Sequence, residues 1–157
     1  WNNDIKPYAL EIIKVIRANS KDSVIIVGTP TWSQDILDPV DNRIDDSNVM
    51  YALHFYAGSH KEWLRERVIK ARSENIPIFV SEWGTTNSDG NGGVAMDEAT
   101  AWVKFMNENK LSYINWSLSD KDEASAILKP GTKKNGFTDD DLSESGKFIK
   151  KVLRDEI

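Results

Sequence analysis

The sequence has 157 residues, a formal net charge of −5, 29% charged residues and no cysteine. This length fits one ordinary domain, and the lack of cysteine excludes a disulfide scaffold and a thiolate metal site. The acidic balance leaves no basic stripe for nucleic acid, and no apolar run approaches the roughly 20 residues of a transmembrane helix, so we expect neither a nucleic-acid nor a membrane partner.

Helix and strand patterns alternate from the start of the chain. Apolar residues at helical spacing predict a first helix, capped by Asn3 or Asp4 and ending at residues 18–20. The β-branched run Val24–Val27, stopped by Gly28, predicts a strand buried on both faces. Residues 29–48 hold at most a short helix near 33–37.

The second half of the pattern repeats this unit. Strands are predicted at 49–56, 76–84 and 111–118. Helices are predicted at about 61–74, on the segment whose inward residues are Ala99, Trp102, Val103 and Met106, and at the end of the chain from Leu142. Val24, Val49, Pro77 and Leu111 follow one another at intervals of 25, 28 and 34 residues, which suits a parallel sheet with right-handed crossovers. Two α/β architectures fit, an open doubly wound sheet or half of an eight-stranded barrel, with residues 1–157 as one structural unit.

Polar residues follow the buried strands at their carboxyl ends, where parallel sheets bind ligands. Glu82 comes directly after one strand. It could be a nucleophile or general base, or it could form a salt bridge at the rim of the sheet or cap the following turn. His54 and Tyr56 are two residues apart and share a face. They could donate hydrogen bonds to a carboxylate or a substrate, or satisfy each other as a buried pair.

Tryptophans also follow the strands. Trp32, Trp83 and Trp116 could stack on sugar rings, or could fill the core. Trp63 and Trp102 fall on helices, where we expect core positions.

A charge run follows the last strand and includes Lys121 and Glu123. It predicts a solvated face, unless the run folds back over the strand ends. His60 precedes a helix and is expected to cap it or to meet solvent. With two histidines and no H-E-x-x-H arrangement, no metal is predicted. The glycines at 90–93 lack the context of a phosphate loop, so no cofactor is predicted either.

Three of these strand ends resemble motifs of glycoside hydrolase family 5, most closely the bacterial endo-β-1,4-glucanases. They are the segments 54–57 (His-Phe-Tyr-Ala), 80–84 (Val-Ser-Glu-Trp-Gly) and 114–121, and Thr31-Trp32 fits as well. The resemblance covers nearly the whole chain. It implies a (β/α)8 barrel that hydrolyses with retention, with Glu82 as the nucleophile at the end of barrel strand seven. His54 and Tyr56, on strand six, would orient Glu82 and the reacting sugar.

The same resemblance implies the substrate contacts. Trp116 would stack under the sugar on the non-reducing side of the cut, Lys121 and Glu123 would bind sugar hydroxyls, and Trp32 would line the leaving-group side. The substrate would be a β-1,4-glucan such as cellulose. The family also implies secretion, although residues 1–4 have neither region of a signal peptide.

One departure from the family pattern concerns the acid/base carboxyl, which a retaining glycosidase needs beside its nucleophile. The family carries it in an Asn-Glu-Pro motif, and the only Asn-Glu pair here, Asn107-Glu108, is followed by Asn109. We therefore expect the C-terminal half of a (β/α)8 TIM barrel, strands five to eight. Its partner would be an N-terminal half-barrel chain that supplies the acid/base Glu. A related β-mannanase and a non-catalytic, self-associating half-barrel remain alternatives.

Overall fold

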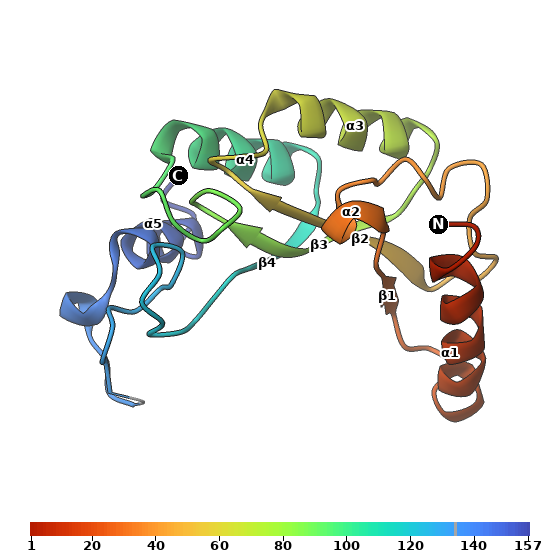
Figure 1. Ribbon diagram of the computed structural model, residues 1–157, viewed down its shortest axis with the longest axis horizontal. Coiled ribbons are helices and arrows are strands. Elements are labelled where there is room, and N and C mark those ends of the chain that lie inside the picture. Colours follow the sequence, from red (N-terminus) through yellow and green to blue (C-terminus); the bar gives the residue numbers. More distant parts are fainter. Residues whose placement is uncertain (134) are drawn as a thin grey trace. The chain divides into compact units, whose positions relative to one another are not determined.

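A computed structural model describes residues 1–133 and 135–157. The chain divides into two units, which are described separately below: unit 1 comprises residues 1–54 and 62–81, and unit 2 comprises residues 55–61 and 82–157. A single domain over 1–157 therefore stays a prediction. In chain order (Figure 1) the elements are α1 (Ile5–Asn19), β1 (Ile25–Val27), α2 (Pro30–Ser33), β2 (Val49–Tyr56), α3 (Glu62–Ser73), β3 (Ile78–Gly84), α4 (Met96–Glu108), β4 (Ser112–Asn115), the 3₁₀ helix η1 (Asp139–Asp141) and α5 (Glu144–Val152).

The four strands form one sheet in the order β1-β2-β3-β4. β1 pairs with β2 in parallel, with Ile25 opposite Val49 and Val27 opposite Tyr51, as the strand–helix alternation predicts. β2 and β3 each begin in unit 1 and end in unit 2. β4 is shorter than the predicted strand over 111–118.

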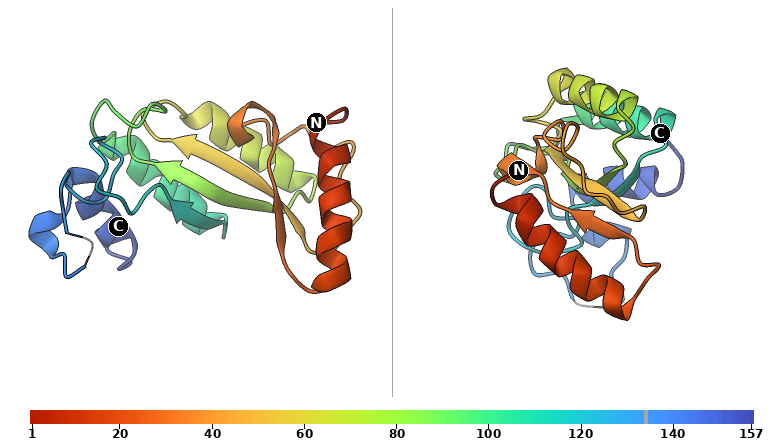
Figure 2. Two further views of the ribbon diagram at one scale, coloured as in Figure 1. Left: turned by 60° about the horizontal axis from the view of Figure 1, so that its bottom comes forward. Right: turned by 90° about the vertical axis from the view of Figure 1, so that its right-hand side faces the viewer.

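In unit 1, α1 lies alongside β1 (Figure 2) and begins where the sequence predicts. Asp4 occupies the N-cap position, but its side chain makes no capping hydrogen bond. The inner face of α3 is formed by Leu64, Val68 and Ala71, all fully buried. The expectation that Trp63 is a core residue is wrong. Because Leu64 and its neighbours at helical spacing take the inner face, the Trp63 indole is 42% exposed.

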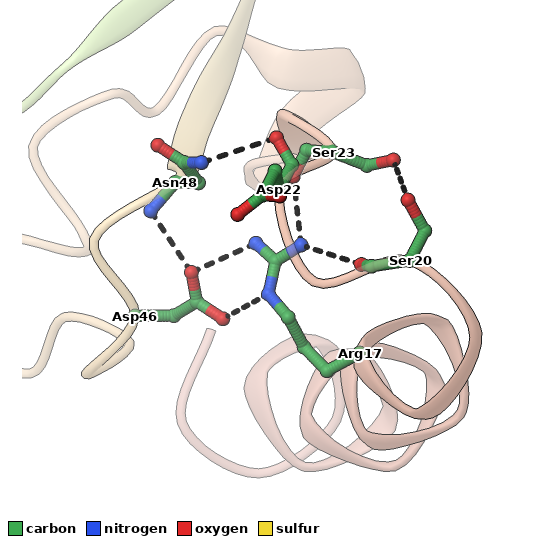
Figure 3. Close-up of polar contacts among 6 residues, drawn as sticks. All are labelled: Arg17, Ser20, Asp22, Ser23, Asp46 and Asn48. Carbon is green, nitrogen blue, oxygen red and sulfur yellow. Dashed lines mark hydrogen bonds and ion pairs between the residues drawn. The ribbon is translucent and has the colours of Figure 1, made fainter.

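A polar network joins the end of α1 to the segments that enter β1 and β2 (Figure 3). Arg17 binds Asp46 through two hydrogen bonds of 2.7 and 2.8 Å and donates a third, of 2.7 Å, to the Ser23 carbonyl oxygen. The Asn48 backbone N–H donates to Asp46 at 2.9 Å. These contacts lower the pKa of Asp46, mainly through the Arg17 hydrogen bond. The network fixes the start of both strands.

Two predictions about the first strand and the segment after it are wrong. Ile25 and Val27 are buried, but Ile26 is 40% exposed, so β1 is covered on one face only. A β-branched run specifies strand propensity, whereas burial depends on what covers each face. The short helix also lies earlier than 33–37, as the single turn α2 at Pro30–Ser33.

The core of unit 2 is built on stacked aromatic rings. Phe55 lies 3.8 Å from Trp102 and 5.5 Å from Trp83 between ring centroids. Trp102 lies on α4 with Ala99, Val103 and Met106, and all four are buried as predicted. Trp83 is fully buried, so of its two interpretations the core one is right.

Among the described residues, no helix combines the length and apolar character needed to cross a membrane. The same residues contain no group of three His, Asp or Glu side chains placed to hold a metal ion.

Candidate functional site

A tyrosine–carboxylate pair stands at the carboxyl ends of β2 and β3 in unit 2. The Tyr56 hydroxyl donates to Glu82 Oε1 at 2.8 Å, and both side chains are half-buried. Burial raises the pKa of Tyr56, and the bond to Glu82 raises it further, so the hydroxyl keeps its proton as a donor. The interpretation of Tyr56 as a donor to a carboxylate is confirmed.

Gly84 gives the Tyr56 ring its place. A Cβ atom at this position would overlap Cδ1 and Cε1 of Tyr56. The ring therefore lies against the backbone at the end of β3, which directs its hydroxyl towards Glu82. Gly84 was not among the predicted site residues, and the sequence signal for it is the glycine that directly follows Glu82-Trp83.

β3 contains one more residue than β2 between two of their backbone hydrogen bonds. The Tyr51 N–H donates to Pro77 O at 2.8 Å, and the Ala57 N–H donates to Gly84 O at 2.9 Å. These bonds are six residues apart along 51–57, which includes most of β2, and seven apart along 77–84, which includes β3. An additional residue interrupts strict alternation along a strand. Accordingly, Glu82 and the residue before it are both half-buried.

His54 belongs to unit 1, where its Nε2 lies 2.9 Å from Ser81 Oγ. Ser81 immediately precedes Glu82, so the imidazole contacts the strand that carries the carboxylate. The role of His54 in orienting the nucleophile and sugar stays a prediction.

Trp32, also in unit 1, projects from a turn with unusual backbone geometry. Thr31, Trp32 and Ser33 have φ values of 54°, 51° and 62°, in the left-handed region that non-glycine residues rarely adopt. The turn is held by Thr31 bonded to Asp35. Trp32 is 84% exposed. Such strained segments concentrate at functional sites, and the exposed ring is available to a ligand.

Glu123 lies at the centre of a second cluster in unit 2. Its side chain is only 8% exposed, pairs with Lys121 and accepts a 2.6 Å hydrogen bond from Ser125 Oγ. These two contacts, and a third from the Trp116 side chain, lower the pKa of Glu123. The expectation that the whole charge run is solvated is therefore wrong for Glu123, whereas Lys121 is exposed.

The two clusters of unit 2 are in electrostatic contact, because the charge of Glu123 also raises the pKa of Tyr56. Unit 2 thus brings together Glu82, Tyr56, Glu123 and Trp116, whose indole is 46% exposed. Lys121 joins them through Glu123. A carboxyl group, a phenol hydroxyl and an exposed aromatic face are what a carbohydrate site uses for nucleophilic attack, hydrogen bonding and stacking.

His60 is not at solvent as expected, because its ring fills a buried position in the turn after β2. Its Nδ1 accepts a hydrogen bond of 2.8 Å from the Tyr56 backbone N–H. The sequence carries no signal for this contact, because the spacing of four residues between Tyr56 and His60 is not typical of any particular hydrogen bond.

Comparisons with known proteins agree with these strand-end motifs. The family described as Cellulase (glycosyl hydrolase family 5) matches residues 1–122. Endoglucanase 5 of Pectobacterium carotovorum subsp. carotovorum is 53% identical over 155 residues, which are 98% of this chain and 31% of that protein. The chain therefore spans about a third of the length of this relative.

Solved structures show the same likeness in three dimensions. A protein from Cytophaga hutchinsonii superimposes with a TM-score of 0.96 at 41% identity, over 99% of this chain and 51% of its own. The catalytic domain of Thermobifida fusca endoglucanase Cel5A, solved in complex with cellotetraose, gives 0.90 at 35% identity, over 96% of this chain and 52% of its own.

A β-mannanase from Streptomyces thermolilacinus gives 0.69 at 18% identity, a likeness of fold alone. The family match covers residues 1–122, which is most of the chain. The chain is a member of the cellulase family, glycosyl hydrolase family 5.

Proposed function

We propose that this chain is part of a retaining endo-β-1,4-glucanase, in which Glu82 is the nucleophile. The observation that carries the proposal is the 2.8 Å hydrogen bond from Tyr56 to Glu82, at the strand ends of a member of this family. The hydroxyl fixes Oε1 of the carboxylate that we propose as the nucleophile.

The reaction we propose has two displacements. A Glu82 oxygen attacks the anomeric carbon, the glycosidic C–O bond breaks, and the leaving oxygen takes a proton from a general acid. This step forms a glycosyl ester on Glu82. A water molecule, deprotonated by the same acid/base, then attacks the anomeric carbon and releases Glu82 as a carboxylate.

The general acid in this proposal comes from outside the chain. Glu123 is a poor acid, because Lys121 and Ser125 lower its pKa and keep it ionised. Glu108, of the only Asn-Glu pair, is the exposed last residue of α4. A carboxyl that must hold a proton near neutral pH needs the opposite environment. We therefore propose that an N-terminal half of the barrel supplies the acid/base Glu and that this chain is the C-terminal half, strands five to eight.

An apolar groove in unit 2 supports a partner of this kind. Its volume is about 700 Å³, and it is lined beside the edge strand β4 by apolar side chains that include Trp83, Ile114, Leu118, Phe137, Ile149 and Leu153. Within the described residues, Trp83 Nε1 and Asn115 Oδ1 are buried there without a hydrogen-bond partner. A strand added to β4 would pair with its edge and cover the apolar side chains. Since this chain matches about half of each solved relative, the remaining half is the occupant we propose.

For the substrate we propose cellulose and related β-1,4-glucans. Trp116 would stack on the sugar before the scissile bond, Lys121 would bind its hydroxyls with Glu123, and Trp32 would line the leaving-group side. The 53% identity to an endoglucanase favours a glucan over a mannan. Secretion stays a prediction of the family resemblance.

The test is covalent trapping in the completed barrel. A 2-deoxy-2-fluoro cellobioside with an activated leaving group should label Glu82 and no other residue of this chain, identified by peptide mass spectrometry. Glu82→Gln should lose labelling and turnover while keeping its fold, because the amide keeps its shape without nucleophilicity. Glu108→Gln is the matched control and should keep both. Labelling of another carboxylate, or normal turnover by Glu82→Gln, would overturn the assignment.

A further inference from the structure

Two hydrogen bonds join His60 and Tyr56 in the turn after β2, and a third joins Ser59 to Tyr56. The Tyr56 N–H donates to His60 Nδ1 at 2.8 Å. In return, the Tyr56 carbonyl oxygen accepts from the His60 N–H at 2.8 Å and from the Ser59 N–H at 3.0 Å. Both backbone polar groups of Tyr56 are thus bound within this turn.

The His60 imidazole accepts the hydrogen bond of a backbone N–H beyond the end of the pairing between β1 and β2. The pairing of β2 with β1 ends at Tyr51, five residues before Tyr56. On the other side of β2, the Ala57 N–H binds Gly84 O. The Tyr56 N–H points away from that side, since successive N–H groups of a strand alternate, and a buried N–H without a partner is costly. His60 Nδ1 replaces the missing strand as acceptor.

The backbone carbonyl of His60 is bound by a residue of the unit 2 core. Trp102 Nε1 donates to the His60 carbonyl oxygen at 2.6 Å, and the Trp102 ring stacks on Phe55. An Nδ1 atom that accepts a hydrogen bond carries no proton, so the ring is neutral with its hydrogen on Nε2. Burial lowers the pKa of His60, which keeps the ring in this neutral form.

We propose that His60 is a positioning residue that holds Tyr56 as the hydrogen-bond donor to Glu82. The linkage runs from the imidazole through the Tyr56 backbone to its hydroxyl and on to the Glu82 carboxylate. Together with Gly84, which leaves room for the Tyr56 ring, it fixes one phenol relative to one carboxylate. The importance of this for catalysis rests on the proposed role of Glu82.

The bonding is tested by NMR spectroscopy on the 157-residue chain, independently of any activity. The side-chain ¹⁵N shifts of His60 should identify the Nε2–H tautomer. A scalar coupling across the hydrogen bond should connect the Tyr56 amide nitrogen to His60 Nδ1. A proton on Nδ1, or no coupling in a well-dispersed spectrum, would overturn the proposal.

The positioning role is tested by the exchange of the Tyr56 hydroxyl proton with water. His60→Leu removes the acceptor, and His60→Asn keeps one, because an amide oxygen can take the place of Nδ1. We expect His60→Leu to accelerate exchange about tenfold or more and His60→Asn to restore most of the protection. Met106→Ala, a buried change on α4, is the control for general loss of stability and should leave this exchange unchanged at a temperature where all variants are folded. Equal exchange in the wild type and His60→Leu, or equal acceleration by Met106→Ala, would overturn the role.

The consequence for turnover is measured in the complex of the chain with the rest of the barrel. His60→Leu should lower kcat about tenfold with little change in KM, because a displaced nucleophile slows the chemical step more than it weakens binding. Unchanged kcat in His60→Leu, with Glu82→Gln inactive, would refute a catalytic consequence of His60. Full activity of Glu82→Gln would instead contradict the proposed function, and the proton exchange of Tyr56 would still decide the positioning role.

Discussion

Removing one oxygen atom, by Tyr56→Phe, isolates the contact on which the site depends. The hydroxyl donates to Glu82 at 2.8 Å, and hydrogen bonds to charged groups contribute about 1.5–3 kcal/mol. If all of that energy served the transition state, the rate would fall about 10- to 150-fold. Both side chains are half-buried, so water can replace part of the bond. We therefore expect the lower end, about a tenfold loss of kcat.

The assay compares kcat and KM on a soluble cello-oligosaccharide, using this chain with the complementary half. The ring of Phe still fits against Gly84, so the free energy of unfolding should change by no more than about 1 kcal/mol. Tyr113→Phe is the matched control, since the Tyr113 hydroxyl makes an exposed 3.4 Å contact with Asn107 Oδ1 and no hydrogen bond with a carboxylate in the described residues. If Tyr56→Phe kept kcat within twofold of the Tyr113→Phe value, the positioning of Glu82 by this hydroxyl would be refuted.

Three further outcomes follow from other parts of the structure. Trp116→Ala should weaken cello-oligosaccharide binding by about 1 kcal/mol or more in calorimetry, whereas Trp63→Ala, a similarly exposed indole on α3, should not; equal losses would make Trp116 a structural residue. Gly84→Ala should lower the free energy of unfolding by about 1–3 kcal/mol in urea titrations, because the new methyl group forces the ring of Tyr56 to move. In the control Gly28→Ala, the added Cβ meets its nearest atom at 3.6 Å, so the free energy of unfolding should change by less than about 0.5 kcal/mol. Similar changes in the two variants would contradict the steric role of Gly84. Because the pKa of Asp46 is lowered, its ionised form stabilises the fold above its unfolded pKa of about 3.9, and this contribution is lost as the pH falls below that value. The urea midpoint of Asp46→Asn should therefore be lower than that of the wild type at neutral pH, and the difference should shrink on acidification. A difference that does not depend on pH would contradict the ion pair with Arg17.

The sequence predicted most of the secondary structure, because the patterns that encode it are local. The inner face of α4 and the strand that ends at Tyr56 were both read from the spacing of apolar residues. The errors fall where a partner distant in the chain decides the outcome. Ile26 is 40% exposed although it belongs to a β-branched run, because such a run does not report what covers each face of a strand.

The candidate site divides in the same way. Glu82 and Tyr56 are found by their position after buried strands, and the structure joins them. The two residues that position this pair, Gly84 and His60, were not predicted from the sequence. Gly84 matters through the space it leaves, and His60 matters because strand pairing ends five residues before Tyr56. Both depend on backbone geometry at the end of the sheet, which a residue type alone does not encode.

The central claim is that this chain carries the nucleophile of a glucanase whose acid/base lies on another part of the protein. The most direct measurement is the specific activity of the purified chain on carboxymethylcellulose and on mannan, alone and mixed with an N-terminal half that brings an Asn-Glu-Pro motif. Size-exclusion chromatography of the same samples would show whether the chain pairs with that half or with itself. We predict no turnover by the chain alone and glucan hydrolysis by the one-to-one complex, abolished by Glu82→Gln. Cellulase-level turnover by the chain alone would contradict the account and require a second catalytic carboxyl among its own residues.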